Sequence, residues 1–126
     1  MSTFKWYKHC IVFSVLFLFS CGKALPSFEG IDLQAWKDDK QACHGARSSM
    51  IEAMDTQSKK LLALSQQEVI ALLGKPDENE LYKRNQKFFY YFIQPSAACT
   101  NSNTQNPKKL VIRFNAMGLA KEVSIE

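Results

Sequence analysis

Residues 65–76 read SQQEVIALLGKP, and they mark a helix whose first and last residues can be identified. Ser65 and Glu68 have the spacing of a capping box, in which each side chain accepts a hydrogen bond from the backbone of the other residue. An apolar stripe follows, formed by Val69, Leu72 and Leu73. Gly74 suits the left-handed position after a helix, and Pro76 cannot continue it. The pattern predicts a helix over 66–73.

After this helix the apolar period changes from 3.6 to 2, which is typical of strands. Residues 80–84 are expected to form a first strand, and 84–87 its turn. The run FFYYFI at 88–93 is the strongest strand signal, and apolar side chains on both of its faces predict a central strand. Residues 110–114 and 119–125 alternate as two further strands, joined by a turn at 115–118.

The segment before residue 65 is predicted to be helical. Asp32 is a suitable N-cap for a helix that starts near Leu33 and carries Trp36, Lys40 and Cys43 on one face up to Gly45. A second helical stretch is expected over 46–62, with an apolar face formed by Ala46, Met50, Met54, Leu61 and Leu62. The chain therefore predicts one α+β domain over 31–126, with N-terminal helices packed on one face of a three- to four-stranded antiparallel sheet.

Composition and charge limit the class of protein. The 126 residues are 46% apolar and 22% charged, close to globular averages, which excludes a disordered, collagen-like or coiled-coil chain. The net charge is +4, and it falls to +2 once the two lysines of the first twenty residues are set aside. Because this balance does not favour nucleic acid, we expect no nucleic-acid partner.

Residues 1–20 have the pattern of an export signal. Lys5 and Lys8 precede an apolar run over 11–19 that is about half the length needed to cross a bilayer. Leu18-Phe19-Ser20-Cys21 then resembles the lipobox of bacterial lipoproteins, in which the signal is cut before the cysteine and the thiol carries a diacylglycerol. The alternative is an ordinary signal with an incidental cysteine. Residues 21–30 would form a lipidated tether, and Gly22 after the cysteine favours the outer membrane by resemblance to the sorting rule of such lipoproteins.

Two cysteines remain for the exported domain, because Cys10 lies in the signal and Cys21 is expected to carry lipid. Cys43 and Cys99 are therefore expected to form a disulfide, the usual state of such a pair outside the cytoplasm. Closing a loop of this length would stabilise the fold by about 4 kcal/mol. Free thiols are the first alternative. A metal or catalytic site at Cys43 and His44 is the second, although the usual ligand spacings are missing.

Residues 64–77, with the aromatic strand and the closing hairpin, resemble the SmpA/OmlA (BamE-like) family of small outer-membrane lipoproteins. The resemblance covers about 64–126. It implies a lipid-anchored module with helices on one face of a sheet, a layout shared by the small repeat domains of β-lactamase inhibitor proteins. It also implies a location at the periplasmic face of the outer membrane and an envelope protein as partner.

The residues themselves favour a non-catalytic binding module. GxSxG, HExxH, CxxC and glycine-rich phosphate loops are absent from the sequence, so we expect no enzyme, cofactor, metal or small-molecule substrate. The acidic residues Asp38, Asp39, Asp77, Glu78 and Glu80 are expected to be solvated. An inhibitor-like binder of an envelope enzyme is the alternative function, by analogy of fold.

Candidate contact sites lie in a basic turn and in the polar loop over 95–107, which Cys99 would hold down. The candidate contact residues are Lys83, Arg84, Lys87, Thr100 and Asn101. Lys108, Lys109 and Arg113 form a second basic group that could attract anionic headgroups. For both basic groups, solvated lysines that protect a strand edge are the competing interpretation.

Overall fold

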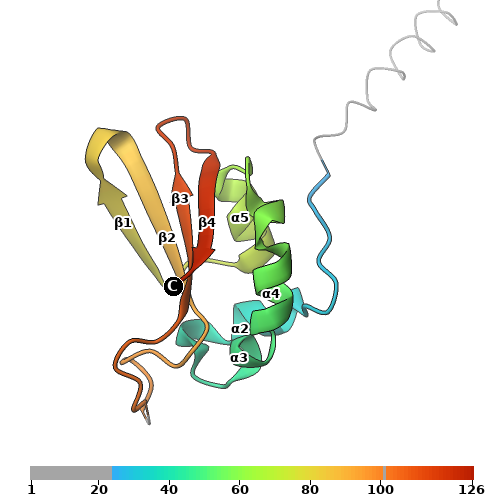
Figure 1. Cartoon of the computed structure of the whole chain (residues 1–126), viewed down its shortest axis with the longest axis vertical. Coiled ribbons are helices and arrows are strands. Elements are labelled where there is room, and N and C mark those ends of the chain that lie inside the picture. Colours follow the sequence, from blue (N-terminus) through green and yellow to red (C-terminus); the bar gives the residue numbers. More distant parts are fainter. Residues whose placement is uncertain (1–23, 101) are drawn as a thin grey trace, which may run out of the picture.

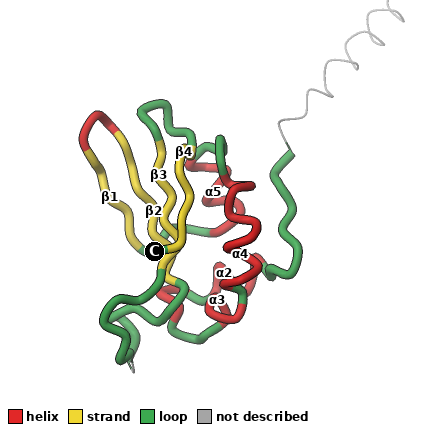
Figure 2. The backbone as a smooth tube through the Cα atoms, viewed as in Figure 1, coloured by secondary structure: helices red, strands yellow, loops and turns green. Residues whose placement is uncertain are grey.

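The computed structural model describes residues 24–100 and 102–126 (Figures 1 and 2). In this part of the chain four α-helices pack on a four-stranded antiparallel sheet, which confirms the predicted α+β architecture. The signal segment 1–20, the lipidation residue Cys21 and the contact residue Asn101 lie outside the described residues.

The first helix is shorter than the sequence pattern predicts. α2 (Leu33–Asp38) starts after Asp32, whose side chain accepts from two backbone N–H groups as expected. It ends at Asp38, and a 3-10 turn, η2 (Lys40–Ala42), follows. The predicted continuation through Lys40 and Cys43 is wrong, because the buried carboxylate of Asp39 accepts from the backbone of His44 and Arg47 and turns the chain into the next helix.

The second helical stretch is divided into three pieces. They are α3 (Ala46–Ser49), α4 (Ile51–Gln57) and the 3-10 helix η3 (Ser58–Leu61). The buried Ser58 hydroxyl donates to the carbonyl of Asp55, a local bond that competes with the α-helical pattern. Met54 and Leu61 are buried as expected, whereas Leu62 lies beyond η3 in extended backbone and is exposed.

The helix at 66–73 forms with the predicted bounds, as α5 (Gln66–Leu73). The hydroxyl of Ser65 accepts from the Glu68 N–H at 3.2 Å, and the Glu68 carboxylate accepts from the Ser65 N–H at 3.3 Å. Gly74 ends the helix with φ +80°, and a Cβ there would lie 3.0 Å from Cγ of Lys37. Glycine is therefore required both by the backbone angle and by the close approach of α2.

The strands are β1 (Glu78–Tyr82), β2 (Gln86–Phe92), β3 (Lys109–Phe114) and β4 (Ala120–Ile125). They pair in chain order, each antiparallel to the next. β1 lies two residues earlier in the chain than the predicted strand at 80–84. It ends at Tyr82 because the turn is formed by η4 (Lys83–Asn85), where Arg84 has φ +61° and Asn85 has φ +59°. The turn at 115–118 forms as expected, and the carboxamide oxygen of Asn115 accepts from two backbone N–H groups.

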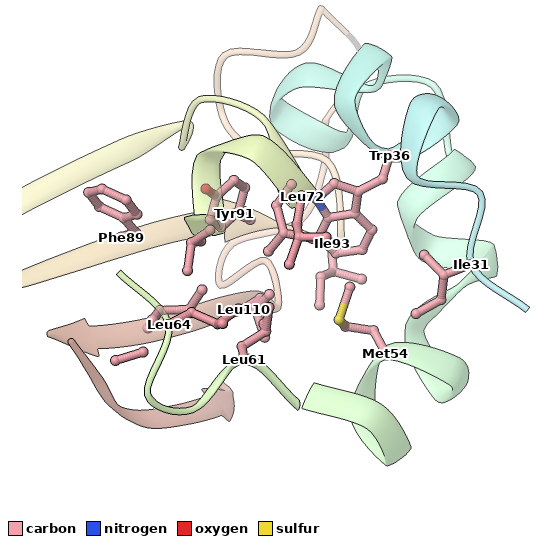
Figure 3. Packing of buried hydrophobic residues seen from close by; sticks show 14 of the residues in the cluster. Ile31, Trp36, Met54, Leu61, Leu64, Leu72, Phe89, Tyr91, Ile93 and Leu110 are labelled. Carbon is pink, nitrogen blue, oxygen red and sulfur yellow. The ribbon is translucent and has the colours of Figure 1, made fainter. Parts of the chain in front are cut away.

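The core lies between the sheet and the helices (Figure 3). From β2 and β3 it receives Phe89, Tyr91, Leu110, Ile112 and Phe114. From the helical segments it receives Trp36, Met54, Leu61, Val69 and Leu73. β2 is central, as predicted, but only its helix-facing side is fully covered, since Phe88 and Tyr90 on the other side are half-buried.

Candidate binding surfaces

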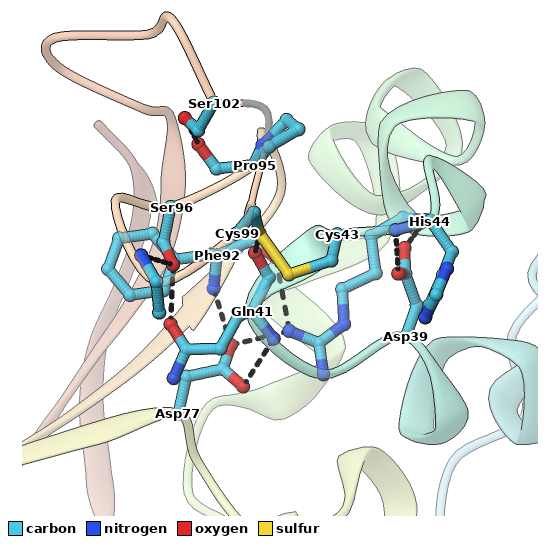
Figure 4. Close-up of a disulfide and its surroundings, with 12 residues drawn as sticks. Asp39, Gln41, Cys43, His44, Asp77, Phe92, Pro95, Ser96, Cys99 and Ser102 are labelled. Carbon is cyan, nitrogen blue, oxygen red and sulfur yellow. Dashed lines mark hydrogen bonds and ion pairs between the residues drawn. A yellow bond between two sulfur atoms is a disulfide. The ribbon is translucent and has the colours of Figure 1, made fainter.

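A disulfide joins Cys43 to Cys99 and confirms the predicted pair, with the two Cα atoms 5.4 Å apart (Figure 4). Cys43 follows η2, and Cys99 lies in the long loop between β2 and β3. The alternative of free thiols is therefore wrong. Within the described ranges, groups of three or more His, Cys, Asp or Glu residues that could hold a metal ion are not found.

Hydrogen bonds fix the same loop on both sides of the disulfide. The Ser96 N–H donates to the backbone carbonyl of Gln41 at 3.1 Å, and the Ser96 hydroxyl donates to the side-chain oxygen of Gln41 at 2.7 Å. Further along the loop, the Ser102 hydroxyl donates to the carbonyl of Pro95. At its base, the Lys108 N–H donates to the side chain of Gln94. The loop is therefore held down as expected, and Thr100 is exposed on it.

A buried ion pair beside the disulfide is the main feature that sequence reasoning missed. Arg47 of α3 is 1% exposed, and the side chain of Asp77, which directly precedes β1, is 3% exposed. The guanidinium donates from Nη1 to Oδ2 of Asp77 and to the carbonyl of Phe92, and from Nε to the carbonyl of Trp36. The prediction that Asp77 is solvated is wrong, because this carboxylate is the acceptor for the guanidinium.

Two buried carboxylates organise the surrounding backbone. Asp77 also accepts from the N–H of Gln41 at 3.0 Å and from the N–H of Phe92 at 2.8 Å. Asp39, likewise predicted to be solvated, is buried and accepts from the N–H groups of His44 and Arg47. Together these bonds tie η2, the start of α3, the start of β1 and the end of β2 directly beneath the disulfide (Figure 4).

The two sets of candidate contact residues lie at opposite ends of β2. Lys83 and Arg84 are exposed at the tip of the β1–β2 hairpin, whereas Thr100 lies in the loop beyond the end of β2 (Figure 1). Lys87 is half-buried, and its Nζ lies 5.6 Å from the ring centroid of Phe89 on the helix-facing side. The structure therefore gives two separate candidate surfaces, the hairpin tip and the β2–β3 loop. Lys83 and Arg84 are available at the hairpin tip, whereas Lys87 is partly covered.

Aromatic rings line the other side of β1 and β2. The ring centroids of Tyr82 and Phe88 are 5.9 Å apart, and those of Phe88 and Tyr90 are 6.1 Å apart. Lys109 places its Nζ 4.5 Å from the centroid of Tyr90, whose hydroxyl donates to Glu80 at 2.8 Å. The pKa of Tyr90 is raised to about 12, first by burial and second by the bond to Glu80 and the charges of nearby carboxylates.

The second basic group is only partly available. Arg113 donates from Nε to Glu122 and from Nη1 to Gln86, and the bond to Glu122 lowers the pKa of that carboxyl. Lys108 is exposed and borders an open groove of about 390 Å³. The other lining residues are Ile51, Glu52, Asp55 and Ile125.

The chain that leads from the N-terminus is fixed to the helices. The side chain of Gln57 in α4 makes two hydrogen bonds with the backbone of Glu29. Its Oε1 accepts from the Glu29 N–H at 2.8 Å, and its Nε2 donates to the Glu29 carbonyl at 2.6 Å. Lys60 of η3 donates to the carbonyl of Ser27 at 2.9 Å, and its Nζ lies 5.6 Å from the ring centroid of Phe28. Sequence reasoning assigned this segment to a tether and missed the contact.

In the part of the chain that the structure describes, every helix is too short or too polar to cross a bilayer. Neither the family models nor the curated proteins compared with this chain give a match.

Proposed function

We propose that this chain is a lipid-anchored binding module of a bacterial cell envelope, resembling the SmpA/OmlA family. Its anchor would be a diacylglycerol on Cys21, and its place the periplasmic face of an outer membrane. Support for the anchor comes from the basic segment, the short apolar run and the sequence Leu18-Phe19-Ser20-Cys21. Two or more acyl chains would hold the protein firmly, whereas one would bind only marginally.

The contact of Ser27–Glu29 with α4 and η3 is the observation that carries the proposal. Cys21 and Ser27 are only six positions apart, a span of at most about 22 Å even when fully extended. The chain reaches the fold beside α4, while β1 lies at the far edge of the sheet (Figure 1). An anchored domain would therefore turn its helices toward the bilayer and leave the opposite face of the sheet, with Tyr82, Phe88 and Tyr90, open to a protein partner.

The disulfide-held loop favours a second form of the same activity, inhibition of an envelope enzyme. Loops on a rigid scaffold commonly carry recognition. Here the disulfide and the bonds that Ser96 donates to Gln41 fix the first half of the loop before any partner is bound. Such preorganisation lowers the entropy cost of inserting a loop into another protein.

Two measurements test the proposal. The intact mass of the mature protein should equal the chain from Cys21 plus its acyl groups, and Cys21→Ser should leave an uncut or misprocessed precursor. Protein captured from detergent-solubilised membranes and identified by mass spectrometry should contain one recurrent envelope partner. An unmodified Cys21 in the native protein contradicts the anchor. If inhibition is the activity, that partner is an enzyme whose rate falls when the purified domain is added.

A further inference from the structure

β1 is a free edge of the sheet. It pairs with β2 on one side, and none of the described residues pairs with its other side. All five of its residues are exposed, with Leu81 at 75% and Tyr82 at 52%. Proline, lysine and bulges often protect such an edge, and β1 has none of these; its only charged residues are Glu78 and Glu80. Its unpaired backbone groups are available to another strand.

The order of charges along the hairpin indicates which charge order a pairing strand would need. Glu78 and Glu80 come first, Leu81 and Tyr82 follow, and the basic residues Lys83 and Arg84 form the tip. An antiparallel partner that runs from basic to acidic would place opposite charges against each other. A second copy of this hairpin has that order, because an antiparallel copy reads the same sequence in reverse.

One register satisfies the side chains best. If Leu81 lies opposite Leu81 of the second copy, Glu80 lies opposite Tyr82, and Glu78 lies beside the hairpin tip of the second copy, which carries Lys83 and Arg84. Glu78, Glu80 and Tyr82 share a face of the strand because their positions differ by even numbers, whereas Arg84 lies in the turn with φ +61°. A register centred on Glu80 would instead place two carboxylates directly opposite each other, which is destabilising. The charge order therefore favours a two-fold axis at Leu81.

We infer that the chain forms a symmetric dimer through β1, joining two four-stranded sheets into one with Leu81 at the two-fold axis. Such an interface is self-complementary, as closed two-fold dimers require. The main contacts between the sheet and the helical segments join β2 to η2 and β4 to η3, so the helix layers of the two copies stay away from an interface at β1. One strand pair buries little surface and binds weakly in solution. Confinement to a membrane, which rests on the proposed anchor, would raise the effective concentration.

Cysteine cross-linking of the full chain in its native membranes tests the register. Residues directly opposite in antiparallel strands have Cα atoms about 4.5–5.5 Å apart, within the range that a disulfide spans. Leu81→Cys should therefore give a covalent dimer on a non-reducing gel under mild oxidation. Met117→Cys is the matched control, because Met117 is 82% exposed but lies in the β3–β4 turn, and it should remain monomeric.

A charge exchange tests the proposed pairing. Adding Arg84→Glu to Leu81→Cys should lower the dimer yield severalfold, and adding Glu78→Arg as well should restore it. No cross-link at Leu81→Cys, or one that Arg84→Glu leaves unchanged, overturns the inference. A cross-link to a different protein also overturns it and identifies another occupant of β1. The dimer can form even if no envelope partner is captured, and a partner can be captured even if no dimer forms. The two results therefore test this inference and the proposed function separately.

Discussion

The carboxylate of Asp77 meets the guanidinium of Arg47 in the interior, thirty positions away along the chain. The same guanidinium carbon lies 5.1 Å from the ring centroid of Trp36, and two carbonyl groups accept its remaining bonds. Removing two charges from water is costly, and it is offset only when the pair is well bonded. This pair is bonded to backbone on both sides, so it fixes how α3, β1 and β2 meet.

Asp77→Ala should therefore be strongly destabilising. It leaves the Arg47 charge buried without its partner, a change that costs about 3–5 kcal/mol in such sites. Urea unfolding followed by circular dichroism would measure the loss. Glu122→Ala is the control, since it breaks the exposed pair with Arg113 and should cost under about 1 kcal/mol. Equal losses in the two variants would contradict the structural role of Asp77.

The disulfide should contribute to stability through the loop that it closes. Cys43 and Cys99 are 56 positions apart, and a loop of that length corresponds to about 4 kcal/mol in the chain-entropy description. The double variant Cys43→Ser, Cys99→Ser should lower the free energy of unfolding by roughly this amount. Reduction of the unaltered protein should have the same effect. A loss below about 1 kcal/mol would mean that the hydrogen bonds of Gln41 and Ser96 hold the loop without the bridge.

Tyr90 should titrate well above an ordinary tyrosine. Its pKa is raised from 10.0 to about 12, so the folded state keeps a proton that the unfolded state loses first. The resulting stabilisation is fully present below pH 10 and disappears as the pH rises through about 12. Absorbance of the phenolate should show this late titration, and Tyr90→Phe should remove it. Glu80→Gln should move it to lower pH, because the neighbouring negative charge is lost; an unmoved titration would contradict the assignment to Glu80.

Deleting Thr100 to Asn106 should weaken capture of the partner while the melting temperature stays nearly unchanged. The deletion spares the Cys43–Cys99 bridge and the bonds between Gln94 and Lys108 at the base of the loop. Pull-down from solubilised membranes measures capture, and calorimetry measures melting. The comparison variant changes Lys83, Arg84 and Lys87 to alanine. If capture survives the deletion but not these three changes, the hairpin tip is the contact surface.

Much of the fold follows from local signals in the sequence. The helix at 66–73 was predictable to the residue because its cap, apolar stripe and stop all lie within twelve positions. The aromatic strand was predictable because six consecutive residues favour extended backbone, and its edges moved by only one or two residues. The disulfide was predictable by elimination, since two cysteines remained once Cys10 was set aside with the expected signal and Cys21 as the expected lipid site.

What the sequence hides are contacts between distant positions. Nothing near Asp39 indicates that its carboxylate binds the backbone of Arg47, so a helix through Lys40 and Cys43 was the natural expectation. Asp77 has the composition of a loop residue, and only the approach of α3 brings Arg47 to it. The attachment of Ser27–Glu29 to α4 is equally distant, and its polar residues resemble those of any linker.

The strands lie side by side in the order in which they leave the ribosome, and this bears on how the protein matures. Each strand can form a hairpin with its predecessor soon after it emerges, so most sheet pairing closes short loops and is expected to be fast. Cys99 emerges before β3 and β4, so oxidation of the thiol pair does not have to await the end of the chain. The bridge can thus join the turn before α3 to the loop after β2 before the final hairpin is made.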